Sequence, residues 1–379
     1  MRFLPFAFLF ASFLLLVLPC PAPACSLCGG YAAKRFGFVS EYWQAHAVLC
    51  GRLANPKLDG SSGTGTTELH VDKMLRPDPR LKGVSPVILP RYLTVLNPKD
   101  PPRMIVLLDE KLFAYGGRDY TPALANFLVE SEAVKGKPRV QALTFFAKYL
   151  DHTDHVVAEE AFLEFAKATD KEVLEAAGQL KPDLFRKLLK DPKLEPERLS
   201  LFAFLLGATG NPADVDYLAS LLRKPDERTA QALEGVLSGY VLRRPKEGWA
   251  WIHATLEDSR RSFVVRWGTV RGLRFLYSAR PELYRDQVLH ATALMITSGD
   301  LADVAIGDLQ KWQLWNHTKL ILAQYGKPSH SAPIVRNALV RYALLCPQPE
   351  ARQFVEQLRK RDPKLVRELE EDLAFEQGK

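Results

Sequence analysis

The sequence predicts an α+β protein of more than one domain, in which a small antiparallel β-barrel precedes an α-solenoid of helical repeats. Two observations lead to this fold class. Between Glu41 and Gly117 the apolar runs are short and interrupted by turn residues, as in a series of short strands. From Tyr120 onward glycine becomes rarer, and apolar residues recur at the spacing of amphipathic helices.

The segment 1–24 has the form of a secretory signal peptide. One basic residue, Arg2, precedes an apolar run that ends at Leu18, and "APA" then supplies the small residues of a cleavage site. A retained membrane helix is the alternative, but the run is shorter than the ~20 residues that span a bilayer, and prolines follow it. We therefore expect cleavage between Ala24 and Cys25 and a protein exported to the periplasm, the cell envelope or the medium.

Export makes the cysteines candidates for disulfide bonds. Four remain after cleavage, namely Cys25, Cys28, Cys50 and Cys346. A bond from Cys28 to Cys50 is favoured and one from Cys25 to Cys28 competes with it, whereas Cys346 is expected to be a buried thiol in a helix. "CSLC" lacks a second ligand pair for zinc and the histidine of a haem attachment site. Cys25 also has an alternative interpretation, as the acylated first residue of a lipoprotein.

The strands are expected in five extended segments. "AHAVLCGRLANP" is typical of a strand that ends at Asn-Pro, and "TELHVDKML" alternates as a strand does. "GVSPVILPRYLTVL" is extended but interrupted by prolines, and "RMIVLLDEKLFAYGG" predicts two strands joined at Asp109-Glu110. A short helix in "GFVSEYWQAHA" is expected to pack on the first strand. Five short strands in so few residues indicate a barrel of the OB type.

The start of this region resembles a netrin-module domain, the OB-type fold shared with tissue inhibitors of metalloproteinases. The likeness rests on "CSLC", "HAVLCGRL" and "TTELHVDKML" and covers about a quarter of the chain. In those inhibitors an N-terminal cysteine, in a C-x-C motif, chelates the zinc of the protease, whereas the spacing here is C-x-x-C. The resemblance implies an OB-like domain over residues 25–119. It also implies an alternative function, the inhibition of an extracytoplasmic metalloprotease.

Segments of similar shape recur in residues 120–379. Each opens with a leucine that ends a helix, passes through a polar turn with Asp or Pro, and leads into a helix with a charged start. The segments begin at Leu150, Leu189, Leu222 and Leu256, which are 39, 33 and 34 residues apart. This is the spacing of two antiparallel helices in a solenoid.

The repeated segments resemble HEAT repeats, including the short variety of the phycobilisome lyases. "LLGATGNPADVDYLASLLRK" is the segment nearest to that pattern. The whole chain is also similar to a group of exported proteins of planctomycete type, which join a signal peptide, a small β-domain and HEAT-like helices. Kinship with the lyases implies a third function, the attachment of a chromophore to cysteine.

The sequence offers no catalytic motif. It contains no G-x-S-x-G elbow, no phosphate-binding P-loop and no H-E-x-x-H. "YLDHTDHVV" gathers Asp151, His152, Asp154 and His155, but it falls in a turn between repeats, where helix capping is favoured over metal binding. We therefore expect no enzyme, no cofactor and no metal site.

Paired tryptophans are the candidate binding residues. Trp249 and Trp251 form one pair, and Trp312 and Trp315 form the other. In a thin two-layer solenoid one member of each pair is expected to reach the surface, where tryptophan is enriched at recognition sites. If the two pairs lie in the same layer, they line one groove. The competing interpretation is that they fill the seams between irregular repeats.

Charge argues against nucleic acid as a partner. The formal net charge is +7, but residues 121–379 hold 37 basic and 35 acidic residues, and no basic stripe with interleaved aromatic residues is present. The sequence thus predicts an exported, non-catalytic binding or scaffold protein. Its helical-repeat surface would bind an extracytoplasmic protein.

Overall fold

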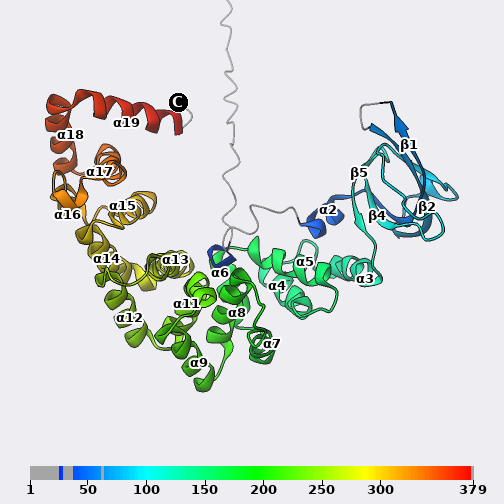
Figure 1. Cartoon of the computed structure of the whole chain (residues 1–379), viewed down its shortest axis with the longest axis horizontal. Helices are drawn as coiled ribbons and strands as arrows, with labels where there is room; N and C mark the ends of the chain where they lie inside the picture. Colours follow the sequence, from blue (N-terminus) through cyan, green and yellow to red (C-terminus); the bar gives the residue numbers. More distant parts are fainter. Residues whose placement is uncertain (1–24, 29–36, 61–63, 377–379) are drawn as a thin grey trace, which may run out of the picture.

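The computed structural model describes residues 25–28, 37–60 and 64–376. The predicted signal peptide, residues 1–24, lies outside these residues. The described chain is α+β: a five-stranded antiparallel sheet stands at one end of a curved stack of helices, and residues 25–28 lie on the concave side of the arc (Figure 1).

The sheet is formed by residues 47–119. Its strands are β1 (Ala47–Asp59), β2 (Thr64–Arg76), β3 (Val87–Leu89), β4 (Arg103–Leu108) and β5 (Ala114–Asp119). All four pairings are antiparallel, and the order across the sheet is β3-β2-β1-β4-β5. The two strands predicted on either side of Asp109-Glu110 are β4 and β5, as expected. The short helix predicted before the first strand is α2 (Phe38–Gln44).

The expected barrel is wrong, because the sheet does not close. β3 and β5 are its two edges, and they are not paired with each other. β3 is only three residues long and is bounded by Pro86 and Pro90, which have no N–H group to extend a ladder. Leu89 of β3 and Gly116 of β5 instead line a hollow of about 100 Å³ between the two edges.

β1 is longer than the sequence predicts. Its expected end is Asn55-Pro56, yet the strand continues to Asp59. The pairing with β2 shifts between Ala54 and Lys57, and Asn55 has a φ of 46°. This bulge takes the proline out of the hydrogen-bonded ladder, so the strand continues beyond it.

The remainder of the chain is helical. The helices after the sheet begin within three residues of β5, and most start with proline at their first position, where its missing N–H costs nothing. They are α3 (Pro122–Ser131), α4 (Arg139–Phe146), α5 (His155–Ala166), α6 (Asp170–Ala177), α7 (Pro182–Leu188), α8 (Pro196–Thr209), α9 (Pro212–Arg223), α10 (Glu227–Gln231), α11 (Leu233–Arg243), α12 (Pro245–Glu257), α13 (Phe263–Ala279), α14 (Pro281–Ser298), α15 (Ala302–Lys311), α16 (Thr318–Leu322), α17 (Pro333–Leu345), α18 (Pro349–Arg361) and α19 (Pro363–Glu376).

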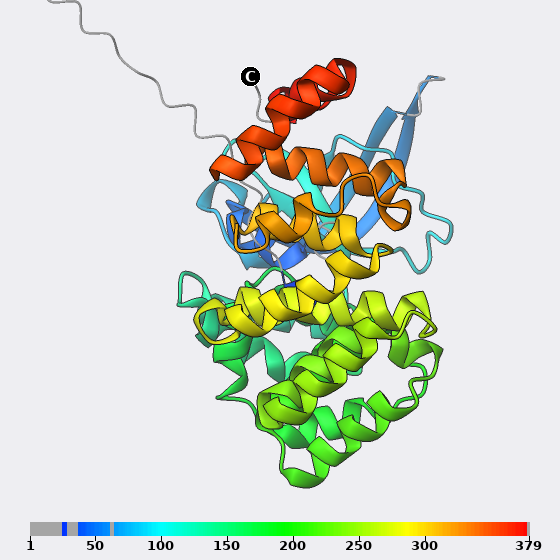
Figure 2. The ribbon, with the colours of Figure 1, turned by 90° about the vertical axis from the view of Figure 1, so that its left-hand side faces the viewer.

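These helices form a two-layer, solenoid-like repeat. α8, α11, α13, α15 and α17 follow one another on the inner side of the arc, and α9, α12, α14, α16 and α18 follow one another on the outer side (Figures 1 and 2). The same kind of contact recurs one repeat later, since Arg266 pairs with Asp300 and Arg274 with Asp308, each 34 residues apart. We call the concave side of this stack the inner face.

The tightest helix contact is between α8 and α11 at the middle of the arc. A Cβ atom placed on Gly235 would lie 1.8 Å from the Ser200 carbonyl oxygen, and one on Gly207 would lie 2.5 Å from the Gly239 Cα atom. Only glycine therefore allows the two backbones to approach this closely.

Both faces of the central strands are buried. Val48, Cys50, Ile105 and Leu107 belong to a core that runs continuously into the helices. Their alternate neighbours on β1 and β4 belong to a second, smaller core on the other face of the sheet, which also holds Leu69, Leu81 and Leu89. The sheet is thus fixed to the first helices by one face and covered by its own loops on the other. Among the described residues, no helix is both long and apolar enough to cross a membrane.

Candidate functional site on the inner face of the helical arc

The N-terminal segment lies on the inner face and not on the sheet. Residues 25–28, which include the 3-10 turn η1 (Ser26–Cys28), pack against α5, α8 and α13. Figure 1 shows this turn beside α6, far from β1. Cys25, Leu27 and Cys28 are each at most 1% exposed. A segment expected to belong to the β-domain therefore forms part of the core of the arc.

Main-chain and carboxylate groups hold this segment in place. The Cys25 nitrogen donates to the Ala166 carbonyl at 3.1 Å, at the last residue of α5. The Ser26 nitrogen and hydroxyl donate to the two carboxylate oxygens of Asp170, at 2.8 and 3.0 Å. Asp170 is placed there because Thr169 caps α6 in a reciprocal capping box with Glu172. The inner face thus holds a short turn of this chain through two backbone nitrogens and the Ser26 hydroxyl.

Two buried carboxylates lie near the segment, Asp170 on α6 and Glu234 on α11. Burial raises the pKa of Asp170, and the bonds from Ser26 oppose that shift. Burial also raises the pKa of Glu234, against the effect of Arg271, whose guanidinium lies 2.7 Å away. The negative charges of both carboxylates contribute to raising the pKa of Cys28.

The described cysteines are free, buried thiols, so the structure does not form the favoured disulfide. Cys28 lies beside Cys25 among the helices, whereas Cys50 lies in the first third of β1. The reason is that the N-terminal segment docks on the arc and does not fold back onto the sheet. Burial, followed by the neighbouring Cys25, raises the pKa of Cys28, and burial raises the pKa of Cys50 to about 11. Because a raised pKa keeps both thiols protonated, neither is activated as a nucleophile.

Cys346 is a buried thiol at the end of α17.

The same geometry bears on the protease-inhibitor alternative. Chelation of a protease zinc requires the main-chain nitrogen of Cys25 to be accessible. Here that nitrogen donates to Ala166, and Cys25 is 1% exposed. No observation favours inhibition, and acylation of the buried Cys25 thiol has no support either.

A cavity of about 480 Å³ opens next to the segment. Its lining combines an aromatic residue with two acids and two arginines: Ser26, Pro196, Glu197, Gln231, Glu234, Trp267, Arg271 and Arg274. Both arginines are held in place by buried carboxylates, since Arg271 pairs with Glu234 at 2.7 Å and Arg274 with Asp308 at 2.8 Å. The cavity therefore presents fixed donors beside a partly exposed ring.

One side of α13 extends this site along the inner layer. Phe263 is 59% exposed and stacks on Trp267 with ring centroids 6.2 Å apart, and the Arg274 guanidinium lies 5.1 Å from the Trp267 ring centroid. Trp267 is absent from the predicted binding residues because it has no tryptophan neighbour in the sequence. The available signal was the spacing of residues 263, 267, 271 and 274, which places them on one face of a helix.

The four tryptophans predicted as binding residues do not share a groove. Trp249 is buried against Tyr284 and Trp251 is partly exposed, both on α12 of the outer layer. Trp312 and Trp315 follow α15 of the inner layer and are partly exposed; Trp312 packs on Tyr277 with centroids 4.4 Å apart and Trp315 on Tyr342 at 4.9 Å.

The acidic and histidine cluster of the first repeat forms a turn. Asp154 caps α5 by accepting from the Val156 nitrogen, and it also accepts from the Thr121 hydroxyl at 2.5 Å. Asp151 pairs with Lys187 at 2.7 Å. Across the parts of the chain that the structure describes, no three His, Cys, Asp or Glu side chains converge in a way that could hold a metal ion.

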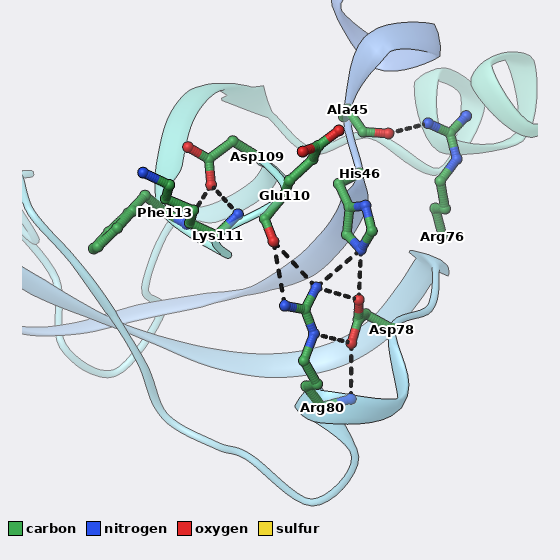
Figure 3. A network of polar contacts seen from close by, with 9 residues as sticks. All are labelled: Ala45, His46, Arg76, Asp78, Arg80, Asp109, Glu110, Lys111 and Phe113. Carbon is green, nitrogen blue, oxygen red and sulfur yellow. Dashed lines mark hydrogen bonds and ion pairs between the residues drawn. The ribbon is translucent and has the colours of Figure 1, made fainter.

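A second polar network lies on the sheet (Figure 3). Asp78 Oδ2 lies 2.6 Å from His46 Nε2 and 2.8 Å from Arg80 Nη2, and the Arg80 guanidinium also donates to the Glu110 carbonyl at 3.2 Å. The Arg80 side chain holds the pKa of Asp78 well below its usual range. The network joins the start of β1, the turn η2 (Pro79–Leu81) and the β4–β5 hairpin, so its role is to fix loops.

Comparison with known proteins leaves the family open. No protein-family model matches the sequence. No curated protein matches it either. Among solved structures, the chain is similar to human deoxyhypusine hydroxylase in complex with glycerol, at 15% identity and a TM-score of 0.28, over 68% of this chain and 92% of that chain. A likeness at this score assigns no activity, substrate or site residue to the chain.

The solved structure found in this way is that of an enzyme, which contradicts the prediction that the protein is not one. We withdraw that prediction. It rested on motifs that are contiguous in sequence, whereas the groups around residues 25–28 come from positions as much as 144 residues apart. A search for short contiguous motifs does not detect a site whose residues lie far apart in the sequence.

Proposed function

We propose that the protein is an exported binding protein that holds a short segment of another protein on its inner face. The observation that carries this proposal is the seat of residues 25–28, where the face already binds a short stretch of chain. Backbone donors of that stretch reach Ala166 and Asp170, and its apolar side chains are buried between helices. Recognition through main-chain bonds tolerates many sequences, as a scaffold requires.

The cavity beside the segment is the proposed point of contact with the partner. Trp267 supplies a rigid aromatic surface, and Arg271 and Arg274 supply donors whose positions are fixed by buried carboxylates. Aromatic and arginine side chains are the residue types that dominate binding energy at interfaces. Since both arginines are already paired, we expect them to bind carbonyl groups of a partner chain, with little preference for acidic residues.

We also assign the finer fold type as part of this proposal. Recurrence of inter-repeat contacts at 34 residues supports HEAT-like repeats for the helical part. The strand order β3-β2-β1-β4-β5, with β3 and β5 facing each other across a hollow, supports an opened OB-like arrangement for the sheet.

Site-specific cross-linking tests the proposed function. A photoreactive residue is placed at position 267 of the full chain, and at position 251 on α12 as the matched control, in cells of the source organism. We expect one cross-linked protein at 267 and none at 251, and we expect Trp267→Ala to abolish co-purification of that protein. Equal cross-linking at both positions, or retention of the partner by a folded Trp267→Ala variant, would contradict the proposal.

A further inference from the structure

The buried acids of this protein follow a rule with one exception. Within the described residues, eight carboxylates are buried. Seven of them lie within 4.0 Å of an arginine, as Glu164 does with Arg139 at 2.8 Å and Asp308 with Arg274 at 2.8 Å. The others in this set are Asp78, Glu159, Glu160, Asp214 and Glu234. The eighth is Asp170, 4% exposed, and no side-chain cation of the described chain lies within that distance.

Among the described residues, the groups that donate hydrogen bonds to Asp170 are neutral. The Ser26 nitrogen and hydroxyl donate to it, and the Ser278 hydroxyl is a further donor. A buried carboxylate with no counter-charge is costly, and burial accordingly raises its pKa. Counting only the residues that the structure describes, the site is therefore short of one positive charge.

The nitrogen of Cys25 is placed where such a charge would be stabilised. It lies 3.1 Å from the Ala166 carbonyl, at the C-terminal end of α5, where the helix dipole favours a cation. Successive backbone nitrogens are about 3 Å apart, so the Cys25 nitrogen lies within about 6 Å of the carboxylate that binds Ser26. An opposite charge at that range stabilises both ions.

We propose that the pocket formed by the α5 C-terminus and Asp170 binds the α-ammonium group created by cleavage before Cys25. Hydrolysis breaks the Ala24–Cys25 amide bond: the hydroxyl of water goes to the Ala24 carbonyl carbon, a hydrogen goes to the Cys25 nitrogen, and the new amine takes one proton from solvent. Processing thus supplies the missing cation and fixes residues 25–28 on the inner face. The proposal rests on the predicted cleavage, which the intact mass of the exported protein tests separately.

The test compares two N-termini in two backgrounds. One chain begins at Cys25, released from a removable tag. The other retains residues 22–24, which preserves the Cys25 amide N–H but moves the amine away from the pocket. Each is made with Asp170 and with Asp170→Asn, and unfolding by denaturant is followed at pH 7 with a reductant present. We expect the Cys25 start to lower the unfolding equilibrium constant about tenfold in the Asp170 background. We expect no difference between the two starts in the Asp170→Asn background.

Two further variants keep the result interpretable. Glu234→Gln alters a second buried carboxylate near the segment, which already has Arg271 as its counter-charge, and should affect both N-termini equally. Ser26→Ala removes the neutral hydroxyl donor but leaves the carboxylate, so the advantage of the Cys25 start should persist even if Asp170→Asn fails to fold. Equal stability of the two N-termini with Asp170, or an advantage of the Cys25 start that survives in a folded Asp170→Asn protein, would overturn the proposal.

Discussion

The sheet and the helical arc tie their polar groups together in different ways. On the sheet, Asp78 and Arg80 are two residues apart, and their network fixes loops at the surface. In the arc, most buried acids pair with arginines of other helices 25 to 39 residues away, as Arg139 does with Glu164 and Arg198 with Glu159. Glu160 of α5 pairs instead with Arg118 of the sheet. The ion pairs of the arc therefore join helices that are distant in the sequence, whereas the Asp78–Arg80 pair of the sheet stabilises a turn. Substitutions that break contacts in the arc should lower the free energy of unfolding more than substitutions in the network of the sheet.

The largest effect is expected at the contact between α8 and α11. Gly235→Val places a branched side chain against the Ser200 carbonyl, where even a Cβ atom would lie at 1.8 Å. The helices must separate, and we expect a loss of about 3 kcal/mol or more in the free energy of unfolding. Gly307→Ala on α15 is the control, because no atom lies within 4 Å of its Cβ position, and it should be neutral or slightly stabilising. Similar losses in the two variants would refute the close-contact explanation.

A smaller loss is expected for an inter-repeat ion pair. Arg186 holds Asp214 through two bonds of 2.7 Å, in the planar geometry that only arginine provides. Arg186→Ala leaves the buried Asp214 carboxylate without its counter-charge, so the unfolding equilibrium constant should rise roughly tenfold or more. Arg186→Lys should recover part of that loss. Lys187→Ala removes an exposed pair with Asp151 and should have a clearly smaller effect in the same denaturant titration. If the two alanine variants lose equal stability, the inter-repeat pairs are not what fixes the arc.

The smallest effect is expected on the sheet, and it should depend on pH. The pKa of Asp78 is lower in the folded protein than its unfolded value of about 3.9, so its ionised form stabilises the fold above that pH. This stabilisation is lost as the pH falls toward the folded pKa. Asp78→Asn should therefore destabilise the protein at pH 7, with a difference from the parent that narrows at pH 3. A difference that is unchanged between pH 7 and pH 3 would contradict this assignment.

Local patterns predict much of the fold. "NPAD" predicts the start of α9, where Asn211 and Asp214 form a capping box and proline occupies the first turn. The bulge at Asn55 that carries β1 past Pro56 was not predictable, because it depends on pairing with β2. Closure of the sheet was predicted wrongly for a similar reason. Whether β3 reaches β5 depends on the path of the loops and not on either strand alone.

The candidate site was mostly beyond the reach of sequence patterns. Ser26 and Asp170 are 144 residues apart, and neither belongs to a motif. The pairing of Arg271 with Glu234 depends on how successive repeats stack. The paired tryptophans are not among the residues that line the cavity, whereas Trp267, at regular helical spacing with Phe263, Arg271 and Arg274, is one of them.

The central claim is that residues 25–28 are bound to the inner face, and hydrogen exchange of the Ser26 amide tests it most directly. In the chain that begins at Cys25, this amide donates to Asp170 and should exchange at least about a hundredfold more slowly than in a free peptide of the same sequence. Leu27→Asp, which places a charge in the buried position of the segment, should restore fast exchange while the helices of the arc stay protected. Exchange of the Ser26 amide at the rate of an unstructured chain in the parent protein would contradict the account.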